Sequence, residues 1–490
     1  MLKYRSRLAW FPIAFFLALV LAACSNSSDS SSDDGSQAVT IGSQTGTISS
    51  GTAGSATFAA ATVNVADGTA GTITWYGSSD GSSAASAPAG VKAEVSAVSS
   101  GSATVTMTAD SSALSGSYYF KLTEGSAGSS VATLTISMAW QAVGIAGLSP
   151  GTASSPSLAF DSSGTPYVAY RDGGNSAKAT VMYYDSSSSS WKALGFAGFS
   201  SGSADFTSLA FNSAGTPYVA YMDYGNGEKA TVMYYDSSSS SWKTLGSAGF
   251  SAEGGVNYTS LAFDSSGTPY VAYMDYGNGE KATVMYYDSS ASSWEALGSA
   301  GFSSGSAKYA SFAIDSSGTP YVAYQDGANG NKATVMYYDG SSWNVLGSAG
   351  FSSGTANYTS LAIDSSGTPY VAYKDGINSY KATVMYYDSS SSSWKTLGSA
   401  GFSSETIDYT SLAIDSSGTP YVAYSDDGSS GKATVMYYDS SSSSWKTLGS
   451  AGFSSGYVDC PSLAIDSSGR PYVAYQDYGN SYKVTVMCYK

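Results

Sequence analysis

Short apolar stretches separated by turns rich in Gly, Ser and Asp recur along most of the chain. One of them, Pro-Tyr-Val-Ala-Tyr, occurs seven times and begins at Pro166, Pro217, Pro269, Pro320, Pro369, Pro420 and Pro471. Trp follows the same rhythm at positions 140, 191, 242, 294, 343, 394 and 445. A period of about 50 residues, sustained over seven units, indicates a repeat architecture in which each unit is one supersecondary element.

Each repeat unit has the pattern of four short strands. In the sixth unit we expect strands at 409–415, 419–424, 433–439 and 445–449. The first two are joined by the turn 415–418, Asp-Ser-Ser-Gly, in which Asp caps the turn and Gly supplies the left-handed position. The second strand is apolar or aromatic throughout its Tyr-Val-Ala-Tyr core, which predicts burial on both faces. Such units, repeated radially, are typical of a β-propeller.

The two ends of the repeat array complement each other. Residues 140–144 supply only a fourth strand before the first full unit, and the last unit stops after its third strand at Lys490. Pairing of these two segments would leave no open sheet edge. The sequence therefore predicts a seven-bladed propeller at 138–490, closed by pairing of the N-terminal strand with the last blade. An open solenoid is the alternative.

Segment 38–137 has a different pattern, with shorter alternating stretches and no fixed period. We expect strands at 57–65, 71–75, 91–98, 103–107, 118–122 and 131–136. This spacing predicts a small β-sandwich. The phrases at 51–58 and 116–120 resemble bacterial immunoglobulin-like spacer domains, so we expect an all-β chain with an Ig-like β-sandwich before the propeller.

The first residues have the pattern of an export signal. A basic start is followed by an apolar run at 8–20 that is too short to span a bilayer. The sequence at 21–24, Leu-Ala-Ala-Cys, resembles the bacterial lipobox, which implies a signal peptide at 1–23 and lipidation of Cys24. Residues 24–37 form a Ser- and Asp-rich tether. We expect a protein of the cell envelope held to the membrane through its lipid alone, on the outer membrane or cell surface where the organism has an outer membrane.

The segment around the Pro-Tyr-Val-Ala-Tyr motif resembles the NHL repeat. The core of that repeat runs Asp, two residues, Gly, two residues, an aromatic residue, Val, Ala and usually Asp, and residues 413–424 follow it except that Tyr424 replaces the final Asp. The present period is longer, and NHL rings usually have six blades. The resemblance implies a propeller and no particular activity.

The amino-acid composition excludes several kinds of catalytic site and argues against one class of partner. The 490 residues include no His, which excludes Ser-His-Asp and Cys-His catalysis and His-ligated zinc. The formal net charge is −15, with 21 Lys and Arg against 36 Asp and Glu, which argues against a nucleic-acid partner. Outside the leader only Arg171 and Arg470 remain, too few for the Arg triad of propeller sialidases.

Two of the four connections in each unit vary in composition and share one face of a propeller. Variable aromatic and polar residues on one face of a rigid ring suit a ligand platform. The candidate ligand-binding residues on this loop face are Tyr224, Tyr276, Tyr380, Tyr478, Arg171 and Lys374. Drift in tolerant loops after duplication is the alternative.

Each second-to-third-strand connection also carries an Asp and a Lys. The pairs are Asp172 with Lys178, Asp223 with Lys229, Asp275 with Lys281, Asp326 with Lys332, Asp375 with Lys381, Asp426 with Lys432, and Asp477 with Lys483. The simpler interpretation is an ion pair that closes the hairpin and caps its turn. The alternative is a ring of carboxylates that binds Ca²⁺, although the spacing is not that of an EF-hand. We expect no cofactor and no metal.

Cys460 and Cys488 replace Tyr in the last unit and form a candidate disulfide, because exported proteins favour paired Cys. The predicted strands place them more than about 7 Å apart, however, which disfavours a bridge. Taken together, the sequence predicts a monomeric, non-catalytic binding or adhesion module for a glycan or protein ligand. The alternatives are a carbohydrate-active enzyme that uses paired carboxylates and a purely structural envelope protein.

Overall fold

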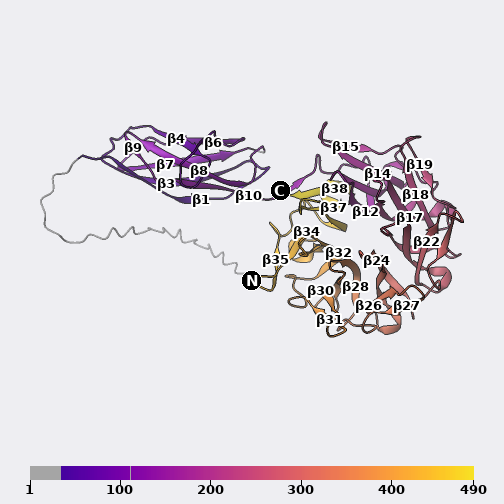
Figure 1. Ribbon diagram of the computed structural model, residues 1–490. Helices are drawn as coiled ribbons and strands as arrows, with labels where there is room; N and C mark the ends of the chain where they lie inside the picture. Colours follow the sequence, from indigo (N-terminus) through magenta and orange to yellow (C-terminus); the bar gives the residue numbers. More distant parts are fainter. Residues whose placement is uncertain (1–34, 111) are drawn as a thin grey trace, which may run out of the picture.

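The computed structural model describes residues 35–110 and 112–490 (Figure 1). The leader, most of the tether and Cys24 lie outside the described residues. Within the described ranges the chain is all-β, and its only helices are short 3₁₀ turns, none long or apolar enough to cross a membrane. The prediction of an all-β chain built from repeated four-stranded units is confirmed.

The N-terminal part consists of two sheets around one core. One sheet has the order β1 (Ala38–Thr45), β3 (Gly54–Val63), β7 (Ser102–Ala109) and β6 (Val91–Val95). The other contains β2 (Ile48–Ser49), β10 (Ala132–Ser137), β8 (Gly116–Glu124), β4 (Gly71–Tyr76), β5 (Ala84–Ala85) and β9 (Ala127–Gly128). Phe58 and Phe120 join the sheets with ring centroids 4.9 Å apart. The sequence missed β1, because only Val39 and Ile41 are strongly apolar in it.

Glu124, at the end of β8, is fully buried, and neither carboxylate oxygen has a hydrogen-bond partner in the described chain. Burial raises the pKa of this carboxyl above its ordinary 4.5. A raised folded-state pKa gives stability that is present below the unfolded value and is lost as pH rises through the folded value. Ionised Glu124 therefore destabilises the N-terminal sandwich near neutral pH.

Glu124→Gln is expected to raise the free energy of unfolding by about 1 kcal/mol near neutral pH, because it removes a buried unpaired charge. The gain should shrink as pH is lowered toward 4.5. Urea denaturation at the two pH values measures it, with exposed Glu94→Gln as the control. An equal gain at both pH values would contradict the explanation.

The remaining chain forms seven four-stranded sheets, which we number as units 1–7. The first strands are β12 (Ala153–Phe160), β16 (Ala204–Phe211), β20 (Val256–Phe263), β24 (Ala307–Ile314), β28 (Ala356–Ile363), β32 (Ile407–Ile414) and β36 (Val458–Ile465). The second strands are β13 (Pro166–Asp172), β17 (Pro217–Asp223), β21 (Pro269–Asp275), β25 (Pro320–Asp326), β29 (Pro369–Asp375), β33 (Pro420–Asp426) and β37 (Pro471–Asp477).

The outer half of each unit is equally regular. The third strands are β14 (Lys178–Asp185), β18 (Lys229–Asp236), β22 (Lys281–Asp288), β26 (Lys332–Tyr338), β30 (Lys381–Asp388), β34 (Lys432–Asp439) and β38 (Lys483–Tyr489). The fourth strands are β15 (Ser190–Ala193), β19 (Ser241–Thr244), β23 (Ser293–Ala296), β27 (Trp343–Val345), β31 (Ser393–Thr396), β35 (Ser444–Thr447) and, in unit 7, β11 (Trp140–Ala142). Figure 1 shows the units in a ring, and first strands of successive units contact one another, β36 and β12 included.

Unit 7 combines the two ends of the repeat region. β11 pairs antiparallel with β38, with Trp140 opposite Tyr489 and Ala142 opposite Met487. Two further backbone bonds join Ala139 and Lys490 at 3.0 and 3.1 Å. Trp140 is 8% exposed and stacks on Phe453 of the preceding connection. The strand that begins the repeats is thus the outer strand of the last sheet.

Adjacent units are joined by the repeated aromatic residues. In unit 2, Trp242 donates from Nε1 to the carbonyl of Leu194 at 2.8 Å and stacks on Phe199, with centroids 4.3 Å apart. The second strands are buried on both faces, and Tyr221 donates its hydroxyl to Met233 Sδ at 3.2 Å. Apolar side chains of two neighbouring units form a buried cluster at each of the seven junctions.

The N-terminal sandwich touches unit 7. Ser50 Oγ donates to the carbonyl of Lys490 at 2.5 Å, and Gln141 Nε2 donates to Ser50 Oγ at 3.0 Å. Gly51 lies so close that a Cβ there would meet the Gln141 side chain at 2.2 Å. The sandwich therefore contacts the sheet in which β11 and β38 meet.

Candidate functional site

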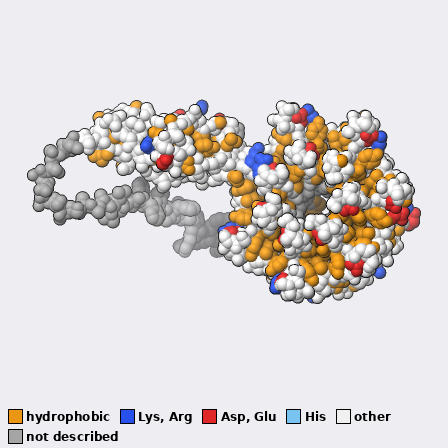
Figure 2. Space-filling view, in the orientation of Figure 1, with side chains coloured by type: hydrophobic (Ala, Val, Ile, Leu, Met, Phe, Trp, Pro, Cys, Tyr) orange, Lys and Arg blue, Asp and Glu red, His pale blue; other side chains and the backbone are white. Residues whose placement is uncertain are grey.

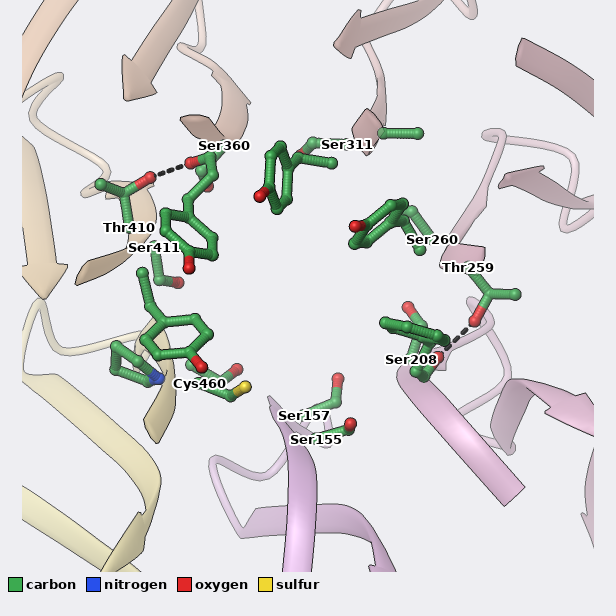
Figure 3. Close-up of a pocket in the computed structure, with 18 of the residues that line it drawn as sticks. Ser155, Ser157, Ser208, Thr259, Ser260, Ser311, Ser360, Thr410, Ser411 and Cys460 are labelled. Carbon is green, nitrogen blue, oxygen red and sulfur yellow. Dashed lines mark hydrogen bonds between the residues drawn. The ribbon is translucent and has the colours of Figure 1, made fainter. Parts of the chain in front are cut away.

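A cavity of about 330 Å³ lies at the centre of the ring. Each of the seven first strands contributes three consecutive residues to its wall, and Figure 3 shows side chains from all around pointing inward. In Figure 2 the hollow lies near the middle of the ring. The lining residues are Ser155–Pro156–Ser157, Phe206–Thr207–Ser208, Tyr258–Thr259–Ser260, Tyr309–Ala310–Ser311, Tyr358–Thr359–Ser360, Tyr409–Thr410–Ser411 and Cys460–Pro461–Ser462.

The first residue of each triplet, which we call the bulge residue, has a left-handed backbone. Its φ lies between 48° and 57° in all seven units, although none of the seven is Gly. At this point the register of the first and second strands shifts, for example between Ser154 and Ser157. A β-bulge of this kind re-aims a side chain, and a non-Gly residue in this conformation costs about 1 kcal/mol. The bulge turns the side chain toward the axis of the ring.

Five of the seven bulge residues are aromatic and form an arc around the cavity. Ring centroids of successive members lie 5.1 Å apart from Phe206 to Tyr258 and from Tyr258 to Tyr309, and 4.7 Å apart from Tyr309 to Tyr358 and from Tyr358 to Tyr409. All five are half-buried. Burial raises the pKa of Tyr258 to about 12 and also raises the pKa values of Tyr309, Tyr358 and Tyr409, so these four hydroxyls stay protonated and can donate. We call this set the aromatic arc.

The third residue of each triplet is always Ser, and its hydroxyl remains able to donate a hydrogen bond. Each Ser Oγ accepts a bond from a backbone N–H of the next first strand, such as Leu209 N to Ser157 Oγ at 2.9 Å. The other six bonds are equivalent and lie between 2.9 and 3.1 Å. Because none of these hydroxyls donates to another group in the described chain, all seven can donate into the cavity.

The second residue of each triplet is Thr in four units, and its hydroxyl donates to the carbonyl of the preceding bulge residue. The four bonds run from Thr207 to Ser155, Thr259 to Phe206, Thr359 to Tyr309 and Thr410 to Tyr358. Units 1, 4 and 7 have Pro156, Ala310 and Pro461 instead. The bulge carbonyls of Cys460, Tyr258 and Tyr409, which these three residues face, therefore receive no such bond.

The predicted loop-face residues surround the start of the first strands. Arg171 and Lys374 are the last residues but one of their second strands and are register partners of Ser154 and Asn357, which directly precede bulge residues. Lys374 pairs with Asp408 at 2.5 Å. The Nε of Arg171 is buried with no hydrogen-bond partner in the described chain. The structure thus brings both cations close to the cavity.

The four predicted Tyr residues lie farther out, on the connections after the second strands. Tyr224, Tyr276 and Tyr478 begin the 3₁₀ turns η2 (Tyr224–Asn226), η3 (Tyr276–Asn278) and η6 (Tyr478–Asn480). They and Tyr380 are 39–48% exposed. The side chain of Tyr380 lies under the Lys374 ammonium, 5.4 Å from ring centroid to Nζ. The Tyr478 hydroxyl donates to Asp459 at 2.6 Å.

The repeated Asp residues at the ends of the second strands serve the fold. All seven are at most 2% exposed. Asp172, for instance, caps η1 (Gly173–Asn175) by accepting from Gly174 N, and its other oxygen accepts from Asn175 and Thr180 at 2.8 and 2.9 Å.

The predicted Asp–Lys ion pairs are wrong, because the two residues are register partners but the carboxylate turns inward to these donors. Within residues 35–110 and 112–490, no three acidic or Cys side chains gather as a metal site.

The candidate disulfide is not formed. Cys460 and Cys488 are both free, and β37 lies between their strands β36 and β38. Two strand spacings amount to roughly 9–10 Å, beyond the reach of a bridge. Cys460 lines the central cavity, whereas Cys488 lines a separate cavity beside Arg470 and Tyr472.

The sequence analysis did not single out Phe206, Tyr258, Tyr309 and Tyr358 as the wall of a cavity. The available signal is their constant place, directly before a Thr-Ser or Ala-Ser pair. The bulge itself leaves no mark, since residues of four types occupy the left-handed position.

No family model matches the sequence, and no curated protein matches it. Similar solved structures include a fungal alcohol oxidase in complex with copper, at 11% identity over 72% of this chain and 75% of that chain, with a TM-score of 0.48. An ulvan lyase from a new polysaccharide lyase family has 12% identity over 70% and 94%, with a TM-score of 0.45. The Aleuria aurantia lectin has 16% identity over 61% and 96%, with a TM-score of 0.38.

Proposed function

We propose that this protein binds a glycan, without catalysis, in the central cavity of a seven-bladed β-propeller. The propeller is closed by β11 and follows an immunoglobulin-like spacer. The observation that carries the proposal is the aromatic arc together with the seven Ser hydroxyls free to donate. Sugar rings offer apolar C–H faces to aromatic rings and hydroxyls to polar groups, so a wall of both kinds suits them.

The size and the lining of the cavity support a small sugar as the ligand. Its volume of about 330 Å³ lies at the lower end of ligand sites, which suits the end of a glycan rather than an internal stretch. None of its lining residues is charged. A glycosidase would need two carboxylates flanking the bond to be cleaved, and the nearest ones, Asp205, Asp408 and Asp459, lie outside the lining set. This arrangement supports binding over turnover.

The predicted leader adds a cellular location to the proposal. A lipid on Cys24 and an acidic tether would hold a monomeric propeller away from the membrane, at the cell envelope and outside the inner membrane. The predicted loop-face residues would then contact the parts of a longer glycan that project from the cavity. Tyr380 and Tyr478, which lie near Lys374 and Asp459, are the foremost of these outer contacts.

Tyr309→Ala and Tyr358→Ala are each expected to weaken glycan binding at least tenfold, about 1.4 kcal/mol, because each removes a half-buried stacking surface. Full-length protein in detergent would be screened on a glycan array, and the affinity for the best ligand would then be measured by calorimetry. Half-buried Tyr119→Ala in the sandwich is the matched control. Recovery of unaltered ligand supports binding without turnover; equal affinity of all variants would count against the cavity.

A further inference from the structure

The sevenfold pattern of the cavity is broken on one side. Ser155 and Cys460 replace the aromatic bulge residue in units 1 and 7, whose first strands contact each other. The aromatic arc therefore has a single continuous gap, and Tyr309 of unit 4 lies across the ring from it. Figure 3 shows Ser155, Ser157 and Cys460 on this side of the cavity. We call it the small-residue sector.

This sector adds acceptors to the Ser hydroxyl donors that are present all around the wall. Ser155 Oγ donates its hydrogen to Asp205 at 2.7 Å, so only its lone pairs remain for a ligand. Four bulge carbonyls receive a Thr hydroxyl, and those of Cys460, Tyr409 and Tyr258 do not, because the facing residues are Pro156, Pro461 and Ala310. Two of these three carbonyls lie at the sector, together with Ser155 Oγ.

Two carboxylates flank the same sector. Asp205 bonds Ser155 Oγ and Phe206 N, and Asp459 accepts from Tyr478, yet neither has an ion pair within the described chain. Their charges reach the cavity wall: burial, followed by Asp459 and Asp205, raises the pKa of the Cys460 thiol to about 12. In the adjacent unit 6, Asp408 is paired with Lys374 at 2.5 Å.

We infer that the glycan carries a free, protonated amino group, and that this ammonium sits in the small-residue sector between Asp205 and Asp459 while its sugar ring stacks on the aromatic arc. The ligand class is a hexosamine without an N-acetyl group. The inference rests on the proposed glycan function.

An ammonium has three N–H donors and no acceptor, so it matches a site of lone pairs. Aromatic faces and unpaired carboxylates add further attraction for a cation. A neutral amide in the same place would leave the two carboxylates without a positively charged partner and would add an acetyl group to the sector.

The test compares chitosan and chitin oligosaccharides of equal length, measured by calorimetry with full-length protein in detergent. The free-amine oligosaccharide is expected to bind at least tenfold more tightly, and its affinity should fall as salt is added. Asp205→Asn and Asp459→Asn should each remove most of this preference. Both should fold, because Asn257 and Asn357 occupy the equivalent positions of units 3 and 5. Asp236→Asn, on a turn at the opposite face, is the control.

The outcomes separate the two proposals. Preference for the amine that is lost in the Asp205 and Asp459 variants supports the inference. Equal binding of both oligosaccharides, weakened by Tyr309→Ala, would overturn it and leave the glycan function standing. Binding of other glycans but neither oligosaccharide would also overturn it. Failure to bind any glycan on the array would overturn the glycan function and the inference together.

Discussion

Trp140→Ala is expected to lower the free energy of unfolding by about 3–5 kcal/mol, the usual cost of deleting a buried Trp. Trp140 is 8% exposed, stacks on Phe453 with centroids 4.2 Å apart, and donates from Nε1 to the carbonyl of Leu448 at 2.9 Å. It also anchors β11, which is three residues long and has no hairpin joining it to β38. Loss of the ring should therefore release the strand as well as leave a cavity.

Trp394→Ala provides the matched comparison. Trp394 is 9% exposed, stacks on Phe351 at 4.2 Å and donates to Leu346 at 2.9 Å. Its strand β31 remains joined to β30 by a short turn, so its loss should cost less than that of Trp140. Denaturation followed by circular dichroism measures both, and size-exclusion chromatography detects association through the uncovered edge of β38. Equal losses, with no association, would show that β11 is not the weak point of the ring.

The second large effect concerns the buried Asp residues. Asp223→Ala is expected to destabilise the protein by about 3 kcal/mol, because it leaves buried donors without an acceptor. Asp223 accepts from Gly225 N at 3.0 Å, Asn226 Nδ2 at 2.7 Å and Thr231 Oγ1 at 3.0 Å. Thermal unfolding followed by circular dichroism provides the measurement.

Asp275→Ala tests the same explanation in a neighbouring unit with the same local sequence. Asp275 accepts from Asn278 and Thr283 through one oxygen, while its other oxygen is buried without a partner. Its replacement should cost about 1 kcal/mol less than that of Asp223. Asp236→Ala, at a turn position paired with Lys243, should cost less than either of these two changes. If Asp223 and Asp275 cost the same, the capping bond to Gly225 contributes nothing measurable.

The four strands of a unit could be predicted because each has a local signal. The predicted strand at 433–439 corresponds to β34 (Lys432–Asp439), and the one at 419–424 corresponds to β33 (Pro420–Asp426). Alternation, Pro at a strand start and an Asp-Ser-Ser-Gly turn are properties of a few neighbouring residues. β1 was missed for the same reason, since it lacks a local apolar pattern and is held by its pairing with β3.

The site was harder to predict than the fold. Arg171 and Lys374 were identified by their variation between units, and they lie near the cavity. Tyr258 and Tyr309 were not among the predicted site residues, because a bulge has no sequence signature. The cavity wall also depends on seven strands that are distant in the chain, so its gap at Ser155 and Cys460 becomes visible only when units 1 and 7 are neighbours.

The pairing of β11 with β38 also affects the order in which the strands can pair during folding. Gln141 and Lys490, which meet in this sheet, are 349 residues apart in the chain. Such a distant contact is slow to form, because the entropy of closing the loop is lost before the contact is gained. During synthesis β11 emerges before all the third strands, and its partner β38 emerges last. Six similar third strands are made before β38. Each of these six has its own fourth strand a few residues away, so a local pairing competes with β11 for every third strand except β38.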